Sequence, residues 1–151
     1  GLRWMVEEGT GRLMVRSPWQ ETPEQWHLTD DVVEPEGEGF RLLGRADTVI
    51  KVAGKRFSTN EVVVAATAAP GVDQAAAVTY QRYGEVAVAL FVAARAGEEL
   101  SIHELRADLG QRLAAFKLPR TIRVLPELPR LSTGKVDLRR LRELAAQGAR
   151  R

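Results

Sequence analysis

Two hydrophobic patterns alternate along the chain after its first quarter, and each predicts one kind of element. Short segments that are apolar, or that alternate between apolar and polar residues, are typical of strands. Two of them flank Ala53-Gly54 and predict a β-hairpin that turns at a glycine, and two more flank Arg82-Tyr83-Gly84 and predict neighbouring antiparallel strands. The predicted strands are residues 48–52, 55–57, 74–80, 85–94 and 121–125.

Three segments with helical features separate or follow these strands. The first begins at a capping box formed by Ser58 and Glu61 and runs to Pro70-Gly71, which ends it. A second capping box, Ser101 with Glu104, begins the next helix, and a third helix closes the chain. The apolar faces are Ile102, Leu105, Leu109 and Leu113 in the second helix and Leu138, Leu141, Leu144 and Ala145 in the third.

The order of these elements predicts an α+β fold. The predicted order is hairpin, helix, strand, strand, helix, strand and helix. This order is typical of a small three-stranded sheet with flanking helices and an N-terminal β-hairpin. Before it, residues 12–15 and 40–43 predict two short strands separated by a loop rich in Glu, Pro and Gly. We therefore expect a partial, β-rich segment over residues 1–46 and a compact domain over residues 47–151.

Composition narrows the classes of protein to which the chain can belong. Its 151 residues are 44% hydrophobic, enough to bury a core, and 22 Lys and Arg against 20 Asp and Glu leave a net charge of +2. So small a charge does not predict a nucleic-acid-binding surface. The lack of cysteine fits a reducing compartment, no apolar run has the length of a membrane span, and the start has neither an initiator methionine nor a signal-peptide core. We expect a piece of a longer, cytoplasmic protein.

Several familiar motifs fail at a position that their chemistry requires. Gly134-Lys135 does not belong to a phosphate-binding P-loop, because Pro129 stands where that loop needs a glycine and Val136 stands where it needs Ser or Thr. His103-Glu104 lacks a second histidine at residue 107, which is alanine, so a zinc-protease helix is not predicted. With two histidines and no cysteine in the sequence, we expect no metal ion held by the protein.

Two separated segments carry the strongest functional signal. Residues 131–135 (LSTGK) place Lys135 on a small loop just ahead of the last helix, and residues 44–57 have the sequence GRADTVIKVAGKRF. Two further segments support them: residues 113–120 (LAAFKLPR) lie between the two, and residues 11–16 (GRLMVR) lie before them. Together, the four segments resemble the adenylate-forming, AMP-dependent acyl-CoA synthetase and ligase family, and the resemblance covers nearly the whole chain.

The resemblance implies an AMP-forming acid–thiol ligase. Members of this family use ATP to activate a carboxylic acid as an acyl-adenylate, release pyrophosphate, and pass the acyl group to the thiol of CoA or of a carrier-protein pantetheine. On this resemblance, residues 1–46 are the tail of a large N-terminal adenylation domain, and residues 47–151 are a mobile C-terminal lid domain with the catalytic lysine. The implied partners are that N-terminal domain, the acid, CoA, and ATP with Mg as its counter-ion.

By the same resemblance, three residues contact the adenylate. Lys135 is the catalytic lysine, whose cation would lie between the substrate carboxylate and the α-phosphate during adenylation. Thr29-Asp30-Asp31 stands where the family has Thr-Gly-Asp, so Asp31 would accept hydrogen bonds from the AMP ribose, with Asp30 in place of glycine. Arg45 would approach the ribose or a phosphate, a task that suits its planar fork of donors.

The residues implied for the second step lie in and before the predicted hairpin. Asp47 matches the hinge position, where a backbone change rotates everything that follows. Gly54 would line the passage for pantetheine, because a residue without Cβ lets a ligand come close. Lys51, Lys55 and Arg56 would flank the route of the anionic CoA, although solvated surface charge explains each of them equally well.

Two other functions stay open at the level of sequence. One is an adenylation domain that loads a carrier protein, which differs from a CoA ligase in its thiol acceptor. The other is a non-catalytic module that keeps the fold and binds a protein partner. Because the family's phosphate loop, adenine-binding segment and acyl pocket all belong to the large domain, we expect the chain alone to be inactive, and its sequence does not predict the acyl substrate.

Overall fold

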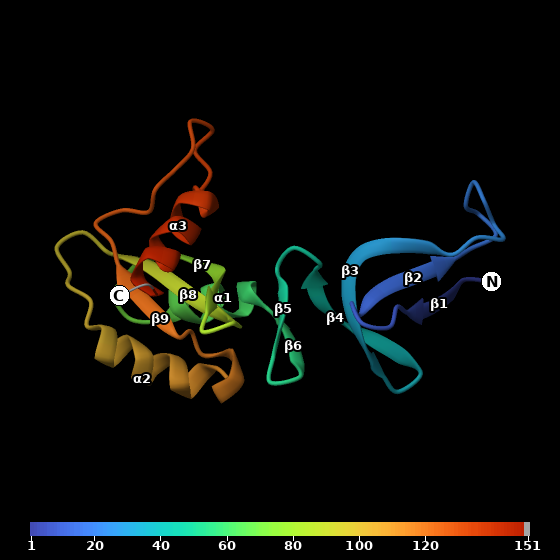
Figure 1. Cartoon of the computed structure of the whole chain (residues 1–151), viewed down its shortest axis with the longest axis horizontal. Helices are drawn as coiled ribbons and strands as arrows, with labels where there is room; N and C mark the ends of the chain where they lie inside the picture. Colours follow the sequence, from blue (N-terminus) through green and yellow to red (C-terminus); the bar gives the residue numbers. More distant parts are fainter. Residues whose placement is uncertain (150–151) are drawn as a thin grey trace. The chain divides into compact units, whose positions relative to one another are not determined.

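A computed structural model describes residues 1–149 and divides them into two compact units. Unit 1 comprises residues 1–50 and 56–58, and unit 2 comprises residues 51–55 together with residue 59 onward. The boundary therefore passes through the hairpin of β5 (Val49–Val52) and β6 (Lys55–Ser58), which contributes residues to both units (Figure 1). Each unit has its own sheet.

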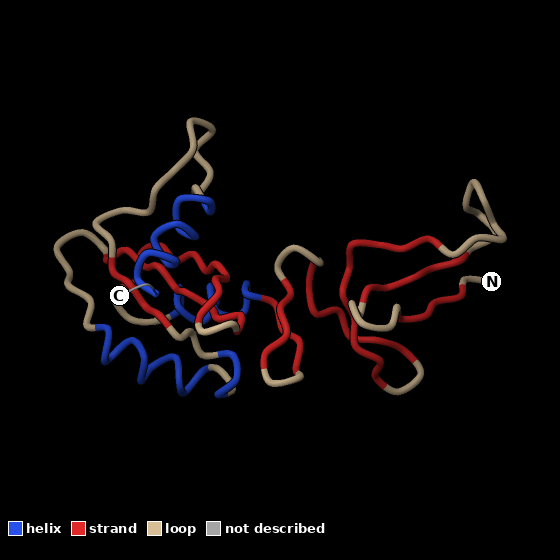
Figure 2. Tube along the Cα trace, in the orientation of Figure 1, coloured by secondary structure: helices blue, strands red, loops and turns tan. Residues whose placement is uncertain are grey.

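Unit 1 is a four-stranded antiparallel sheet without a helix among its residues (Figure 2). The strands, in spatial order, are β1 (Arg3–Val6), β2 (Arg12–Arg16), β3 (His27–Glu36) and β4 (Gly39–Arg45). The two strands predicted here are confirmed as β2 and β4, but the prediction of a loop between them is wrong for β3. The charged residues toward the ends of β3 obscure its strand pattern in the sequence, because only Val32 and Val33 in its middle are deeply buried. Pairing with strands on both sides holds it in the sheet.

The β5–β6 hairpin turns where the sequence predicts. Ala53 and Gly54 both have positive φ, 51° and 78°, as the two central residues of a type I′ turn require. That turn matches the right-handed twist of the strands beside it, so two residues suffice to join them. Glycine adopts this backbone without strain, whereas alanine does so at a cost.

Unit 2 is a three-stranded mixed sheet with helices. β7 (Val72–Arg82) and β8 (Glu85–Ala94) are antiparallel, and β9 (Thr121–Val124) lies parallel to β8 at the edge. A parallel neighbour needs a crossover connection, and α2 (Ile102–Arg112) with a short 3-10 turn at Ala115–Lys117 provides it. The remaining helices are α1 (Thr59–Ala68) and α3 (Leu138–Ala149). The predicted order and fold class are confirmed.

Helices cover both faces of this sheet, since every residue from 87 to 93 in the central strand is buried. α1 and α2 cover one face through residues such as Val62, Ala66, Leu105 and Leu109. The other face packs against α3 and the loop before it, in a cluster of Ala76, Val78, Tyr80, Ala87, Ala89, Phe91, Leu128, Leu141 and Ala145. Burial of this apolar area is the main term that stabilises unit 2.

The predicted helix faces are confirmed in their central residues. Leu109 and Leu141 are fully buried, whereas Ile102 and Leu138, each the first residue of its helix, are exposed. One of the two bonds of the predicted capping box of α2 is present, because the Ser101 side chain accepts a hydrogen bond from the N–H of Glu104 at 3.2 Å. No helix within residues 1–149 is long and apolar enough to cross a membrane.

Candidate functional site

Lys135 lies on a loop between β9 and α3 whose backbone is held in a tight, hairpin-like form. The N–H of Leu131 donates to the carbonyl of Lys135 at 2.8 Å, and the N–H of Gly134 donates back to Leu131 at 2.9 Å. The N–H of Asp137 donates to the carbonyl of Pro129 at 2.8 Å. Gly134 has a φ of +89°, a left-handed conformation that favours glycine, so the glycine before Lys135 follows from the shape of the loop.

The ammonium group of Lys135 is available to a ligand. Its side chain is exposed and forms neither a hydrogen bond nor an ion pair with any of residues 1–149. The residues that follow are anchored, since Val136 packs against the core of unit 2 and Asp137 Oδ1 accepts the N–H of Arg140 at 3.0 Å at the start of α3. A mobile cation therefore projects from a fixed base.

Asp31 and Arg45 face each other on neighbouring strands of unit 1. They are register partners on β3 and β4, and Arg45 Nη1 lies 3.3 Å from Asp31 Oδ1. Arg45 Nη2 lies 3.4 Å from Asp30 Oδ2, and Arg12 Nη2 donates to Asp30 Oδ1 at 2.8 Å. The structure thus brings the two predicted residues together and adds Arg12, which sequence reasoning missed because it comes from a third strand.

The contacts of Arg45 are long for charge-assisted hydrogen bonds, which are usually 2.7–2.9 Å. Its side chain is also 62% exposed, so these ion pairs add little stability and can exchange for contacts with a ligand. Arg12 is held more firmly, because its Nε also donates to the carbonyl of Thr29 at 2.8 Å. Asp30, the residue in place of the family's glycine, is thereby paired with Arg12. Within residues 1–149, Asp31 forms a salt bridge with Arg45 alone.

The predicted hinge and hairpin residues divide between the two units. Asp47 is exposed in the turn between β4 and β5, shortly before the boundary that follows Ile50. Gly54 is at the exposed tip of the hairpin in unit 2, where, its chain neighbours apart, no atom of residues 1–149 lies within 4 Å of the position that a Cβ would take. Lys51 is exposed on the same segment. Arg56 belongs to unit 1, where its guanidinium donates to the carbonyl of Gly9.

Lys55 is held by an aromatic ring of unit 2. Its Nζ lies 5.0 Å from the centroid of Phe116 in the 3-10 turn, and Lys117 Nζ lies 5.5 Å from the same ring. Lys117 also bonds to Glu61 Oε2 at 2.6 Å, in the first turn of α1. This group of Lys55, Phe116, Lys117 and Glu61, which we term the hairpin clamp, joins the tip of the hairpin to two other elements of its unit.

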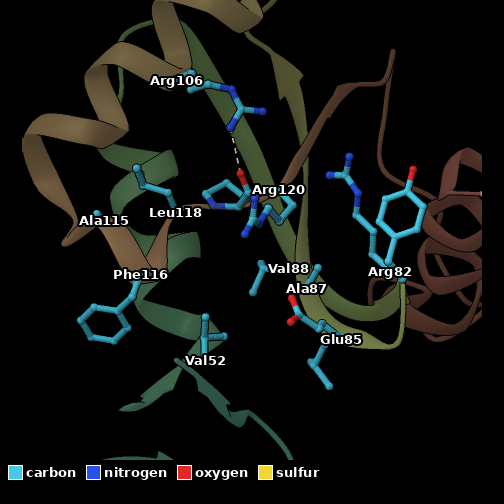
Figure 3. A pocket seen from close by; sticks show the side chains of 13 residues that line it. Val52, Arg82, Glu85, Ala87, Val88, Arg106, Ala115, Phe116, Leu118 and Arg120 are labelled. Carbon is cyan, nitrogen blue, oxygen red and sulfur yellow. Dashed lines mark hydrogen bonds between the residues drawn. The ribbon is translucent and has the colours of Figure 1, made fainter. Parts of the chain in front are cut away.

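A basic groove of about 620 Å³ opens on unit 2 beside the clamp (Figure 3). Three arginines from different elements line it: Arg82 at the end of β7, Arg106 on α2, and Arg120 just before β9. None of the three pairs with a carboxylate within residues 1–149, and Arg106 instead donates to the carbonyl of Pro119 at 2.9 Å. Such a cluster of cations is suited to a ligand with several phosphate groups.

Tyr83 lies at the rim of the same groove in a strained conformation. Its φ is +49°, uncommon for a bulky residue, and its side chain is 89% exposed, with the Arg82 guanidinium 5.6 Å from its ring. An exposed aromatic face next to cations can stack on a nucleotide base. Sequence reasoning missed the groove, because its arginines are far apart in the chain and converge only when β7, α2 and β9 pack.

The region from α1 to Lys135 matches a known family model. Residues 61–135 match the model described as the AMP-binding enzyme C-terminal domain. An acetyl-coenzyme A synthetase of Mycolicibacterium smegmatis is 35% identical over 134 residues, which cover 84% of this chain and 14% of that protein. A 3-hydroxybenzoate–CoA ligase of Aromatoleum sp. is 31% identical over 156 residues, which cover 91% of this chain and 30% of that protein.

Solved structures share the fold. An anthranilate CoA ligase in complex with anthranoyl-AMP superposes with a TM-score of 0.66 at 25% identity, covering 97% of this chain and 34% of that one. ATP-bound MatB from Rhodopseudomonas palustris gives 0.71 at 21% identity, covering 99% and 34%. The chain spans less than a third of the length of the two relatives compared by sequence, the acetyl-coenzyme A synthetase and the 3-hydroxybenzoate–CoA ligase.

Within residues 1–149 no group of three or more His, Cys, Asp or Glu side chains could hold a metal ion.

Proposed function

Because the chain belongs to the family of AMP-binding, adenylate-forming enzymes, we propose that it acts as the C-terminal part of an AMP-forming acid–thiol ligase. The complete polypeptide would convert a carboxylic acid and ATP to an acyl-adenylate and pyrophosphate, and would then transfer the acyl group to the thiol of CoA with release of AMP. Residues 47–151 would be the mobile lid, and residues 1–46 would belong to the larger domain with which the lid works.

The observation that carries this proposal is the exposed Lys135 on its glycine turn, with a side chain that is unpaired within residues 1–149. In the first step, negative charge shifts from the attacking carboxylate toward the α-phosphate. A cation placed between the two groups stabilises that transition state more than it stabilises the bound substrates, which is the condition for a faster reaction. ATP would bring Mg²⁺ as its counter-ion.

Asp31 and Arg45 suit the AMP portion of the intermediate. The Asp31 carboxylate can accept hydrogen bonds from the ribose hydroxyls, and the Arg45 fork can turn to the ribose or a phosphate once its long contacts to Asp30 and Asp31 open. Little stability is lost by that exchange, because both ion pairs are solvent-exposed.

The basic groove favours CoA as the thiol acceptor. The phosphates of CoA could bind Arg82, Arg106 and Arg120, and its adenine could stack on Tyr83. The hairpin adjoins the groove, because Val52 lines it and Lys55 lies over Phe116, which also lines it. A pantetheine arm would then pass the open tip at Gly54.

Replacement of Lys135 by alanine tests the catalytic role. In the complete polypeptide, we expect Lys135→Ala to slow adenylation about 100- to 1,000-fold, because a positioned electrostatic donor is lost. Thioester formation from preformed acyl-adenylate should be nearly unchanged. Pyrophosphate exchange measures the first step, and a thiol-consumption assay measures the second.

The matched control is Arg139→Ala, which also removes one positive charge near the start of α3, from a side chain that is 90% exposed. It should leave both steps unchanged. Equal loss of the two steps in Lys135→Ala would contradict the assignment, since a lysine needed only for folding or for lid movement would affect both.

A second experiment separates CoA from a carrier protein. We expect Arg120→Gln to raise the KM for CoA about 10-fold, the effect of about 1.4 kcal/mol of lost phosphate binding, without changing pyrophosphate exchange. The KM for free pantetheine, which lacks the phosphates and the nucleotide, should stay the same. Faster transfer to a phosphopantetheinylated carrier protein than to CoA would instead identify a carrier-loading adenylation domain.

A further inference from the structure

The loop that carries Lys135 is tied to the sheet of unit 2 by the side chain of Arg130. Its Nη1 donates to the carbonyl of Gly134 at 2.9 Å, and its Nη2 donates to Gln74 Oε1 at 2.8 Å. One planar guanidinium thus joins the residue directly before Lys135 to strand β7. We term Arg130, Gln74 and the Gly134 carbonyl the loop brace.

Gln74 lies at the start of the regular part of β7, directly after a β-bulge. β7 pairs Val72 with Ala94 and Gln74 with Ala93, so Asp73 is an extra residue without a partner on β8. Ala93 and Ala94 are consecutive and face opposite sides of the sheet, so Val72 and Gln74 also face opposite sides although they are two residues apart. Gln74 keeps the alternation of Ala76, Val78 and Tyr80, which pack against α3, so it lies on the face that α3 and the Lys135 loop cover, whereas Val72, on the other side of the bulge, lies on the opposite face.

The Lys135 ammonium depends on its backbone for position. Its side chain contacts no polar group of residues 1–149, and its four-carbon stem is flexible. Backbone hydrogen bonds fix the shape of the loop, but they lie within residues 129–137 and do not themselves attach it to the sheet. The isolated bridge between Arg130 and Val136 joins the two arms of the loop. The two bonds from the Arg130 guanidinium connect the loop to β7, in addition to the packing of Val136 against the core.

We propose that Arg130 and Gln74 are positioning residues for the adenylation step, because they hold the Gly134 carbonyl, and with it the base of the Lys135 side chain, at a set place on unit 2. This inference rests on the proposed catalytic role of Lys135. A displacement on the order of 1 Å can cost about 100-fold in rate, so even a solvent-exposed brace can influence the chemistry.

The geometry calls for arginine at this position. A guanidinium presents donors in a rigid plane, and two of them reach two acceptors on different segments at once. A lysine at residue 130 would present a single ammonium on a flexible stem, which makes a bridge of the same rigidity unfavourable. Gln74 has a carboxylate isostere, so Gln74→Glu keeps the acceptor oxygen and adds a charge opposite to that of Arg130.

The test uses the complete polypeptide and the two half-reactions. We expect Gln74→Leu and Arg130→Gln each to lower the kcat of adenylation about 10-fold, with the KM for ATP and the rate of thioester formation unchanged. Gln74→Glu should keep the wild-type rate. Gln81→Leu, at the exposed opposite end of β7, is the matched control and should change neither step. Hydrogen exchange of a peptide spanning residues 130–136 should become faster in Gln74→Leu and stay unchanged in Lys135→Ala.

The outcomes separate the brace from the function on which it rests. If Lys135→Ala stops adenylation while Gln74→Leu and Arg130→Gln retain full kcat, the brace is overturned and the catalytic role of Lys135 stands. Unchanged hydrogen exchange in Gln74→Leu also overturns the brace. If Lys135→Ala retains adenylation, the proposed function fails, and a kcat loss in Gln74→Leu would then have another cause, so the positioning role falls with it.

Discussion

Tyr83 and Ala53 each occupy the first central position of a two-residue hairpin turn, with φ of 49° and 51°. An L-residue with a Cβ is disfavoured there by about 1–2 kcal/mol, whereas asparagine tolerates the conformation better. At Ala53 the strain is local to a hairpin tip. At Tyr83 the strained residue also places an aromatic ring, 89% exposed, at the rim of the basic groove.

Tyr83→Asn should therefore stabilise the fold while it impairs the second step. We expect the free energy of unfolding to rise by about 0.5–1 kcal/mol, because part of the backbone strain is relieved. The KM for CoA should increase several-fold as the stacking surface is lost. Denaturant unfolding and thioester kinetics measure the two effects. Ala53→Asn is the control for strain relief alone at a similar turn, and a loss of stability in Tyr83→Asn would show that the contact of the ring with Arg82 outweighs the strain.

At the scale of elements, the hairpin clamp links β5–β6 to α1 and the 3-10 turn. Each cation–π contact at an exposed site contributes about 0.5–1 kcal/mol, and the bond between Lys117 and Glu61 orients one of the two cations. The clamp thereby connects two features that the proposed second step uses, the open tip at Gly54 and the basic groove.

Removal of the ring should loosen the hairpin. We expect Phe116→Ala to accelerate hydrogen exchange of residues 51–55 and to slow thioester formation a few-fold, with pyrophosphate exchange unchanged. Phe116→Trp keeps a larger aromatic face for the cations and should preserve both rates, which makes it the matched control. If exchange of the hairpin is the same in Phe116→Ala, the clamp does not hold the tip.

At the scale of the whole molecule, two units meet along the chain in one hairpin, and the exposed turn with Asp47 lies shortly before that boundary. This arrangement along the chain is compatible with a hinge at Asp47, which stays a prediction, as do the division at residues 46 and 47 and the cytoplasmic location. The chain presents a cation and a groove but spans less than a third of the length of the two curated ligases described above.

We accordingly expect the 151-residue chain alone to give no pyrophosphate exchange, whereas the complete polypeptide that carries it is active. The physical reason is that one cation and the two proposed ribose contacts cannot bind ATP and an acid together, so the proposed larger domain must supply the remaining contacts. Pyrophosphate exchange at equal molar concentrations of the two proteins makes the comparison. Activity of the isolated chain at the level of the complete polypeptide would contradict a lid function.

The sequence by itself determined the features that depend on near neighbours in the chain. Period and capping predicted the three helices and the strands of unit 2, the Ala53-Gly54 turn and the loop of Lys135, but not the 3-10 turn at Ala115–Lys117. Helices, tight turns and their caps form from contacts a few residues apart. The same local motifs also led to the family, which the comparisons confirm. β3 was not predicted, because its ends are polar and its place in the sheet depends on pairing with strands on both sides.

Only the tertiary structure decided which distant residues act together. Arg82, Arg106 and Arg120 form one groove because three elements pack side by side, and Arg12 meets Asp30 through the register of β2 and β3. Gln74 reaches Arg130 because α3 and the loop before it pack on the face of β7 that Gln74 shares with Ala76 and Val78. Such pairings depend on strand register, bulges and packing, which are set by the whole core. They therefore cannot be predicted from the local spacing of residues.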